Sequence, residues 1–157
     1  MQILLERYGR WIGRWSAASE LNGMKEFAKA CRQQGILVSY AHSDATTRQA
    51  MEANDWGFSH FTHLYSCMSS VHRRQGRRFG GLVEAAYLMP QTTVELITDG
   101  MHLPPELAEL AWRCKGADRA CLITDSMRAA GLPEGEYVLG SKDSDHRVIV
   151  KDGVAWM

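Results

Sequence analysis

The sequence predicts an α/β fold in which strands and helices alternate along the chain. Short apolar runs rich in β-branched residues alternate with segments of helical periodicity, and only a few residues connect them. This pattern is typical of parallel βα units. About five strands are predicted before residue 125, whereas a closed β/α barrel has eight strands in roughly 250 residues. Several strand-like runs end in polar side chains that could bind a metal or a substrate, namely His42, His63, Asp99 with His102, and Asp125.

The composition indicates a globular domain with an ordinary core. The chain has 157 residues, of which 45% are hydrophobic and 23% charged, and its formal net charge is +0. Such a chain is not drawn by its overall charge to nucleic acid or to anionic membranes. The first residues contain no long apolar run, so neither a signal peptide nor a membrane span is expected. The 4 cysteines form no CxxC pair, and we expect reduced thiols in a cytoplasmic protein.

The first half of the chain is predicted to contain three helices and three strands. Gly35 is well placed to cap the second helix at its carboxyl end. Ser43 or Asp44 could cap the amino end of the third helix. The expected helices are Met1–Tyr8, Met24–Gln34 and Thr46–Asn54, and the expected strands are Trp11–Ala18, Ile36–Tyr40 and Phe58–His63.

The second half continues the alternation and then changes character. Ser66–Arg78 is interpreted as a polar loop, and Pro104 and Pro105 suit the start of a helix. After Gly131 the pattern favours antiparallel strands around turns at Lys142–Asp145 and Asp152–Gly153. The expected helices are Gly80–Leu88 and Glu106–Cys114, and the expected strands are Thr92–Thr98, Ala120–Thr124, Glu136–Gly140 and Arg147–Met157.

Two histidines follow consecutive strands of the predicted sheet. Neighbouring parallel strands would place the rings of His42 and His63 within reach of one metal ion, and imidazole nitrogen suits zinc, iron and related metals. Two ligands make a weak metal motif, and a pair of structural, hydrogen-bonded histidines explains the same spacing. His60 lies three residues before His63, so it is expected on the opposite face of the strand with a structural role.

The remaining polar positions have both a functional and a structural interpretation. Arginine side chains match the geometry of phosphate, but composition alone favours a solvated basic loop for Ser66–Arg78. A nucleic-acid role is weaker, because the basic run is short and Phe79 is its only aromatic neighbour. Asp99 could belong to a turn, His102 to the surface, and Asp125 could cap a helix.

Six segments occur in order and at fitting distances along the chain. Together they resemble the N-acetylglucosamine-6-phosphate deacetylases, a family of the amidohydrolase superfamily, from about Ser16 to Met157. The segments are AHSDAT (Ala41–Thr46), THLYSCM (Thr62–Met68), HRR (His72–Arg74), ITDGMHLPP (Ile97–Pro105), LITDSMRAAG (Leu122–Gly131) and GEYVLG (Gly135–Gly140).

The resemblance implies a partial metal-dependent (β/α)8 barrel, covering about strands four to eight, in residues 1–132. Residues 133–157 are expected to begin the strands of a small β-sandwich. The family is implied to be a cytoplasmic homodimer that acts on an amino-sugar phosphate and uses a divalent metal. Zinc is the first choice for that metal, with iron or manganese as alternatives.

The resemblance also implies roles for single residues. His42 and His63 match metal ligands, Asp125 matches the catalytic aspartate, and His102 matches a histidine that contacts the sugar and polarises the amide. Arg74 matches an arginine that reaches the substrate phosphate from the neighbouring subunit. Further substrate contacts are expected from Ser66, Cys67 and His72.

The implied reaction is hydrolysis of the acetamide of N-acetylglucosamine 6-phosphate to glucosamine 6-phosphate and acetate. Asp125 would act as general base and then as general acid. Ser66–Cys67 replaces the Asn-Ala of the family, Ala18–Ser19–Glu20 stands at its APE segment, and Ala41 replaces a glycine. No match is found for the family's metal-binding glutamate or for strands one to three. We therefore expect a truncated chain with little or no activity.

Two alternatives remain. Another amidohydrolase, such as a dihydroorotase-like enzyme, would keep His42, His63 and Asp125 but would not need the arginine-rich loop. A non-catalytic fragment or assembly module would keep the barrel sequence without the chemistry. A generic α/β domain with incidental histidines explains the ordered segments less well.

Overall fold

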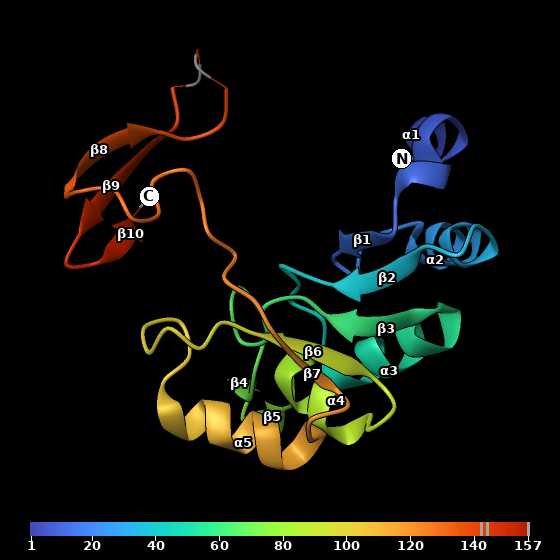
Figure 1. Cartoon of the computed structure of the whole chain (residues 1–157). Coiled ribbons are helices and arrows are strands. Elements are labelled where there is room, and N and C mark those ends of the chain that lie inside the picture. Colours follow the sequence, from blue (N-terminus) through green and yellow to red (C-terminus); the bar gives the residue numbers. More distant parts are fainter. Residues whose placement is uncertain (142, 144, 157) are drawn as a thin grey trace. The chain divides into compact units, whose positions relative to one another are not determined.

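The chain forms two compact units, which are described separately. The computed structural model describes residues 1–141, 143 and 145–156 (Figure 1). The first unit is Met1–Ile123 and the second is Thr124–Met157. Lys142 and Ser144 of a predicted turn, and Met157 at the end of the last predicted strand, lie outside the described residues. The boundary predicted between residues 132 and 133 falls inside the second unit and stays a prediction.

A five-stranded parallel sheet is the centre of the first unit. Its strand order is β1-β2-β3-β6-β7, so all five strands follow chain order, with the β4–β5 hairpin inserted between β3 and β6. This confirms the predicted α/β class with a parallel sheet. The strands are shorter than predicted, because the chain turns before the polar residues that follow them. The bounds are β1 Arg14–Ala17, β2 Leu37–Tyr40, β3 Phe58–Phe61, β6 Thr93–Leu96 and β7 Ala120–Leu122.

The helices of the first unit agree with the predicted ones to within a few residues. They connect successive strands, as in βα units, and their apolar sides contribute to the core. Helix α1 ends at Tyr8, as predicted, with Gly9 as its carboxyl-terminal cap, and a short 3-10 helix, Gly9–Trp11, follows it. The α-helices are α1 Gln2–Tyr8, α2 Met24–Gln33, α3 Thr47–Trp56, α4 Leu82–Leu88 and α5 Pro105–Lys115.

The two faces of the sheet differ in character. One face carries apolar side chains that pack with the helices, such as Val38, Tyr40 and Phe61, all fully buried. Tyr40 stacks on Phe61 at 4.4 Å and donates a hydrogen bond to the carbonyl of Ala50 in α3. The opposite face carries hydrogen-bonded polar side chains, including Ser39 and His60. Alternation along the strands separates these two sets.

The ends of two helices show how local sequence sets their bounds. After α2, Gly35 has a φ of +72°, its N–H bonds the carbonyl of Arg32, and the N–H of Ile36 bonds the carbonyl of Cys31. This is a Schellman motif, which confirms Gly35 as the carboxyl-terminal cap. Helix α3 is instead capped by Thr46 in a capping box with Gln49. The prediction of Ser43 or Asp44 as this cap was wrong, because both are engaged by another loop.

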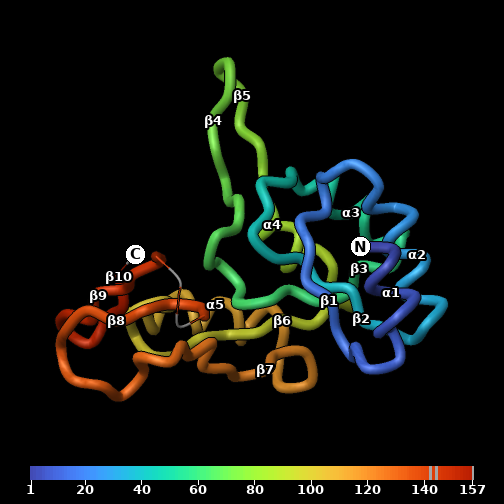
Figure 2. The backbone as a smooth tube through the Cα atoms, turned by 90° about the horizontal axis from the view of Figure 1, so that it is seen from above, coloured from blue at the N-terminus to red at the C-terminus, as the bar shows by residue number. Residues whose placement is uncertain are grey.

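The arginine-rich stretch is a β-hairpin and not the loop that was predicted. Strand β4 (His72–Arg74) pairs with β5 (Arg77–Phe79) in antiparallel register. Gln75 and Gly76 form the turn with φ values of 48° and 79°, as a tight two-residue hairpin turn requires. Figure 2 shows the hairpin projecting away from the five-stranded sheet.

The second unit contains a three-stranded antiparallel sheet of order β10-β9-β8, which confirms the predicted change of character. Asp152 and Gly153, with φ values of 51° and 75°, make the predicted turn between β9 and β10. At the end of the first unit, β7 lies at the edge of the sheet and Leu122 is 71% exposed. The strands of the second unit are β8 Gly135–Val138, β9 Arg147–Lys151 and β10 Val154–Trp156.

Candidate functional site

Two histidines meet just beyond the carboxyl ends of β2 and β3. The Nε2 atoms of His42 and His63 are 3.0 Å apart, and the ring centroids are 4.9 Å apart. His63 is buried, whereas His42 is exposed. Both residues have a positive φ, 48° for His42 and 35° for His63, which is uncommon for residues with a side chain. The strand ends predicted to converge therefore do so for these two residues.

The histidine pair fits a divalent metal such as zinc. Zinc–nitrogen distances of about 2.0–2.1 Å at tetrahedral angles separate two ligand nitrogens by roughly 3.3 Å, close to the spacing found here. The Nδ1 of His63 is buried without a hydrogen-bond partner among the described residues, so His42 is the only described hydrogen-bond partner of this ring. Within the described residues, no group of three or more His, Cys, Asp or Glu could hold a metal ion. The described residues therefore supply two ligands, His42 and His63, for such a metal.

Two glutamates for which the sequence indicated no role hold the backbone beside these histidines. Glu95 in β6 accepts the backbone N–H of His63 at 3.3 Å. Glu20, which follows β1, accepts the backbone N–H of Asp44 at 2.8 Å. Each loop after a strand is thus held by a carboxylate from the neighbouring strand. The only signal in the sequence was the position of each acid. Glu95 alternates with the apolar residues of its strand and so lies on the face away from the apolar core, and Glu20 follows β1 closely.

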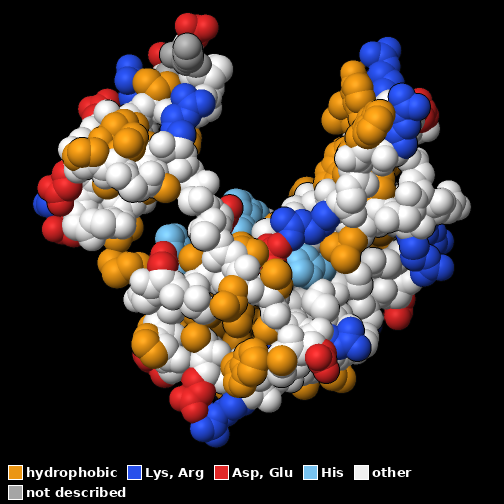
Figure 3. All heavy atoms as spheres, viewed as in Figure 1, with side chains coloured by type: hydrophobic (Ala, Val, Ile, Leu, Met, Phe, Trp, Pro, Cys, Tyr) orange, Lys and Arg blue, Asp and Glu red, His pale blue; other side chains and the backbone are white. Residues whose placement is uncertain are grey.

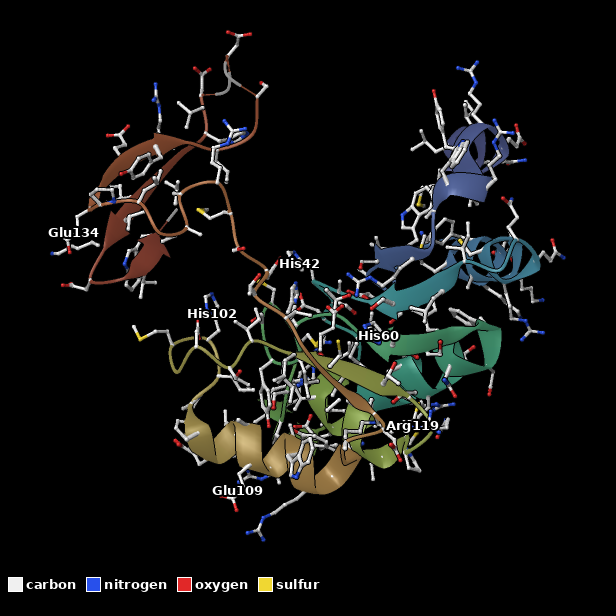
Figure 4. The ribbon with its side chains drawn as sticks, in the orientation of Figure 1. His42, His60, His102, Glu109, Arg119 and Glu134 are labelled. Atoms are coloured by element: carbon white, nitrogen blue, oxygen red, sulfur yellow. The ribbon has the colours of Figure 1, made fainter. Side chains whose placement is uncertain are left out.

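His60 belongs to a polar network on the sheet and not to the histidine pair. Its Nε2 lies 3.3 Å from Nη1 of Arg14, and its Nδ1 lies 2.6 Å from the hydroxyl of Thr93. Oε1 of Glu95 also lies 3.3 Å from this Nε2, so a donor from Arg14 and an acceptor from Glu95 meet at the same ring nitrogen. Arg14 also forms an ion pair with the buried Glu95. Burial, and then the positive charge of Arg14, lower the pKa of His60 to about 4. Figure 4 shows His60 apart from His42.

His102 is oriented by Asp99 in the loop between β6 and α5. The Nδ1 of His102 lies 2.6 Å from Oδ2 of Asp99, whose Oδ1 accepts the backbone N–H groups of Met101 and His102. Partial burial raises the pKa of Asp99, but these hydrogen bonds outweigh it and lower the pKa to about 2. The carboxylate therefore stays ionised and fixes the ring. Figure 3 shows histidine side chains at the surface, and Figure 4 labels His42 and His102.

One of the two predicted substrate contacts after β3, Cys67, borders a pocket beside His42. The pocket has a volume of about 390 Å³ and is lined by His42, Asp44, Cys67 and Met68. Cys67 is exposed and has a φ of 48°. Ser66 precedes it and donates its backbone N–H to the carbonyl of His63. This loop therefore follows the second histidine directly and brings Cys67 to the same pocket as the first.

The predicted phosphate ligands lie on the hairpin. Cross-strand partners share a face, so Arg74 and Arg77 lie on one face with His72 and Phe79, while Arg73 and Arg78 lie on the other. The ring of His72 stacks on Phe79 at 5.7 Å. All these side chains are exposed. The hairpin thus presents paired arginines whose like charges face each other across the strands, an arrangement that an anion would stabilise.

The predicted catalytic aspartate belongs to the second unit. Asp125 follows the first unit closely in the chain, is exposed, and has a φ of 47°. A positive φ outside glycine is a reason to consider a functional role. Its place relative to the histidine pair stays a prediction.

Comparison with known proteins gives a consistent family relationship. No family model matches the sequence. The chain is 43% identical over 126 residues to the N-acetylglucosamine-6-phosphate deacetylase of Lysinibacillus sphaericus, which covers 80% of this chain and 31% of the relative. It is 35% identical over 135 residues to the N-acetylgalactosamine-6-phosphate deacetylase of Escherichia coli O157:H7, covering 85% of this chain and 34% of the relative.

A solved structure extends the similarity to the fold. It is an aspartate-to-alanine mutant of the Mycobacterium smegmatis N-acetyl-D-glucosamine-6-phosphate deacetylase in complex with N-acetyl-D-glucosamine-6-phosphate. The TM-score is 0.87 at 28% identity, and the match covers 98% of this chain and 38% of that chain. The fold and the sequence matches identify the chain as a homologue of hydrolases of the amidohydrolase type. More particularly, it is homologous to the N-acetylglucosamine-6-phosphate deacetylases and spans about a third of their length.

Proposed function

We propose that this chain forms the later part of a (β/α)8 barrel and the first sandwich strands of a metal-dependent deacetylase that acts on N-acetylglucosamine 6-phosphate. The observation that carries the proposal is the 3.0 Å approach of His42 and His63 at the carboxyl end of the parallel sheet. Catalytic residues of β/α barrels lie at that end. The names of the relatives supply the substrate class.

In this proposal, His42 and His63 hold a divalent metal, zinc in the first place and iron or manganese as alternatives. Such a metal, when bound, lowers the pKa of coordinated water and polarises a carbonyl. Asp125 removes a proton from water and later returns it to the leaving amine. His102, fixed by Asp99, directs its Nε2 to the substrate and stabilises negative charge on the amide oxygen.

The hairpin supplies phosphate recognition in the same proposal. Arg74, assisted by His72, binds the 6-phosphate through charge-assisted hydrogen bonds. In the proposed homodimer it does so in the site of the neighbouring subunit, which accords with its place on a projecting hairpin (Figure 2). Ser66 and Cys67 contact the substrate beside the pocket. A cytoplasmic location remains part of the proposal, and none of the helices described is long and apolar enough to cross a bilayer.

Acetate release from N-acetylglucosamine 6-phosphate, with and without added zinc, tests the proposal. We expect the 157-residue chain to turn over slowly, because its described residues assemble only two metal ligands. His63→Ala should abolish both the residual turnover and zinc binding. Robust turnover that is insensitive to His63→Ala would contradict the assigned site.

The match to N-acetylgalactosamine-6-phosphate deacetylases favours a second candidate substrate that differs from the first in one hydroxyl configuration. Parallel assays with both sugar phosphates decide between them. Arg74→Ala tests the dihydroorotase-like alternative, since only a phosphate-binding role makes turnover depend on that side chain. A chain that binds no zinc at micromolar concentration would instead support a non-catalytic assembly module.

A further inference from the structure

Glu20 connects the end of β1 to the loop that carries His42. One carboxylate oxygen, Oε2, accepts the hydroxyl of Ser43 at 2.5 Å, and the other, Oε1, accepts the backbone N–H of Asp44 at 2.8 Å. These are the two residues that follow His42 in the chain. Hydrogen bonds to an ionised acceptor are short and about twice as strong as neutral ones. The carboxylate of Glu20 therefore holds this loop by one side-chain group, the Ser43 hydroxyl, and by one backbone group, the Asp44 N–H.

The loop needs such support because His42 has an unfavourable backbone conformation. A φ of 48° at a residue with a side chain persists only when its surroundings enforce it. The hydrogen bonds that enforce it are made by the next residue, Ser43. Its N–H bonds the carbonyl of Cys67, and its carbonyl accepts the N–H of Ser69. Ser43 is thus held from the loop after β3 on its backbone, and from the loop after β1 on its side chain.

We propose that Glu20 is a positioning residue that keeps the Nε2 of His42 beside the Nε2 of His63. The inference rests on the proposed function, in which these two rings hold a metal. Glu20 is not itself assigned as a metal ligand, since both its oxygens already accept hydrogen bonds and no group of three metal-ligating residues occurs among those described. Its action reaches the metal through Ser43 and the backbone at His42.

The first measurement compares zinc affinity of the 157-residue chain with that of Glu20→Ala and Glu20→Gln. Loss of a group that orients a metal ligand typically costs about 10–100-fold in metal affinity. We expect Glu20→Ala to weaken zinc binding by about tenfold or more. Glu20→Gln should recover part of this, because its amide oxygen can still accept the N–H of Asp44. Glu52→Ala, at an exposed position of α3, is the control and should bind as the unchanged chain does.

The second measurement uses Ser43→Ala, alone and combined with Glu20→Ala. If the carboxylate acts through the hydroxyl of Ser43, the double variant should lose less affinity than the sum of the two single losses. If the losses of zinc affinity in the two single variants add, the Ser43 hydroxyl does not carry the effect of Glu20. The hydrogen bond to the backbone N–H of Asp44 would then be the remaining contact through which Glu20 acts.

The third measurement needs no metal. Nuclear magnetic resonance signals of the histidine rings in the metal-free chain report the environment of His42 and His63. We expect Glu20→Ala to shift and broaden the His42 signals and to leave those of His102 unchanged. Unchanged His42 signals and unchanged zinc affinity would refute the role of Glu20. If the unchanged chain binds no zinc, the proposed function fails, while the metal-free signals still decide whether Glu20 positions His42.

Discussion

At the scale of single residues, the polar face of the sheet depends on protonation states that follow from burial and neighbouring charge. His60 is buried beside the positive charge of Arg14, and both conditions favour its neutral ring. Its pKa of about 4 is below the 6.5 of a free histidine. The unfolded chain therefore binds more protons than the folded chain between these two values. Stability contributed by the neutral ring is present above pH 6.5 and is lost as the pH falls through about 4.

We accordingly expect the free energy of unfolding to fall by on the order of 2 kcal/mol between pH 6.5 and pH 4 through this residue. Urea denaturation across this range, compared with His60→Gln, isolates the contribution. Glutamine can still accept from Arg14 but does not titrate, so the variant should show a shallower pH dependence. Identical slopes in the two proteins would contradict the neutral assignment.

Lys115 offers a second test at the residue scale. Its buried ammonium donates to the carbonyls of Met89 and Thr92 and to the hydroxyl of Thr92, at 2.8, 3.0 and 2.8 Å. Lys115→Met would fill the space but remove the ammonium donor from the carbonyl of Thr92, at a cost of about 2 kcal/mol in the free energy of unfolding. The carbonyl of Met89 would keep the N–H and the hydroxyl of Thr92 as donors. Lys29→Met, at an exposed position of α2, should change it little. Equal urea midpoints for the two variants would show that the three hydrogen bonds contribute nothing net.

Sequence reasoning found the histidine pair but not the groups that hold it. His42 and His63 were predictable because each follows a strand, and parallel strands bring such positions together. Glu20, Ser43 and Glu95 were not predictable in their present roles, because their partners are distant in sequence and two of the bonds involve backbone N–H groups. Backbone donors leave no pattern of side chains that could be recognised.

At the scale of secondary-structure elements, helix α3 shows what capping contributes. Thr46 accepts the N–H of Gln49, and the side chain of Gln49 accepts the N–H of Thr46. Thr46→Ala removes one half of this capping box, and we expect a loss of about 1 kcal/mol in the free energy of unfolding. Arg48→Ala, at an exposed position of the same helix, serves as the control. Circular dichroism during urea denaturation measures both, and equal losses would exclude a specific cap.

The elements themselves were largely predictable, with an instructive exception. Apolar periodicity, Gly35 and the Pro104–Pro105 pair set the helices, and β-branched residues set the strands. The hairpin of β4 and β5 was missed because four arginines in Ser66–Arg78 favour a solvated loop over strands. The Gln75–Gly76 turn, which accepts positive φ values, was the available signal.

At the scale of the whole chain, the two units differ in what they can bury. The first unit contains nearly all of the buried hydrophobic residues and a continuous core beneath the sheet. The second is shorter than the roughly 40 residues below which a domain usually needs other support to fold. A fragment of residues 1–123 should therefore unfold cooperatively by itself, whereas residues 124–157 alone should not. Thermal denaturation followed by circular dichroism tests both; a non-cooperative transition in the longer fragment would contradict the division.

The order of the five-stranded sheet places β1 at its edge, bonded on one side to β2. The backbone of an edge strand can accept another strand, and this has a practical use. A separately produced polypeptide that adds a parallel strand beside Arg14–Ala17 would extend the sheet without any covalent link. Under the proposed function, the chain is a starting point for a split-protein reporter, in which zinc-dependent acetate release would signal that two pieces have met.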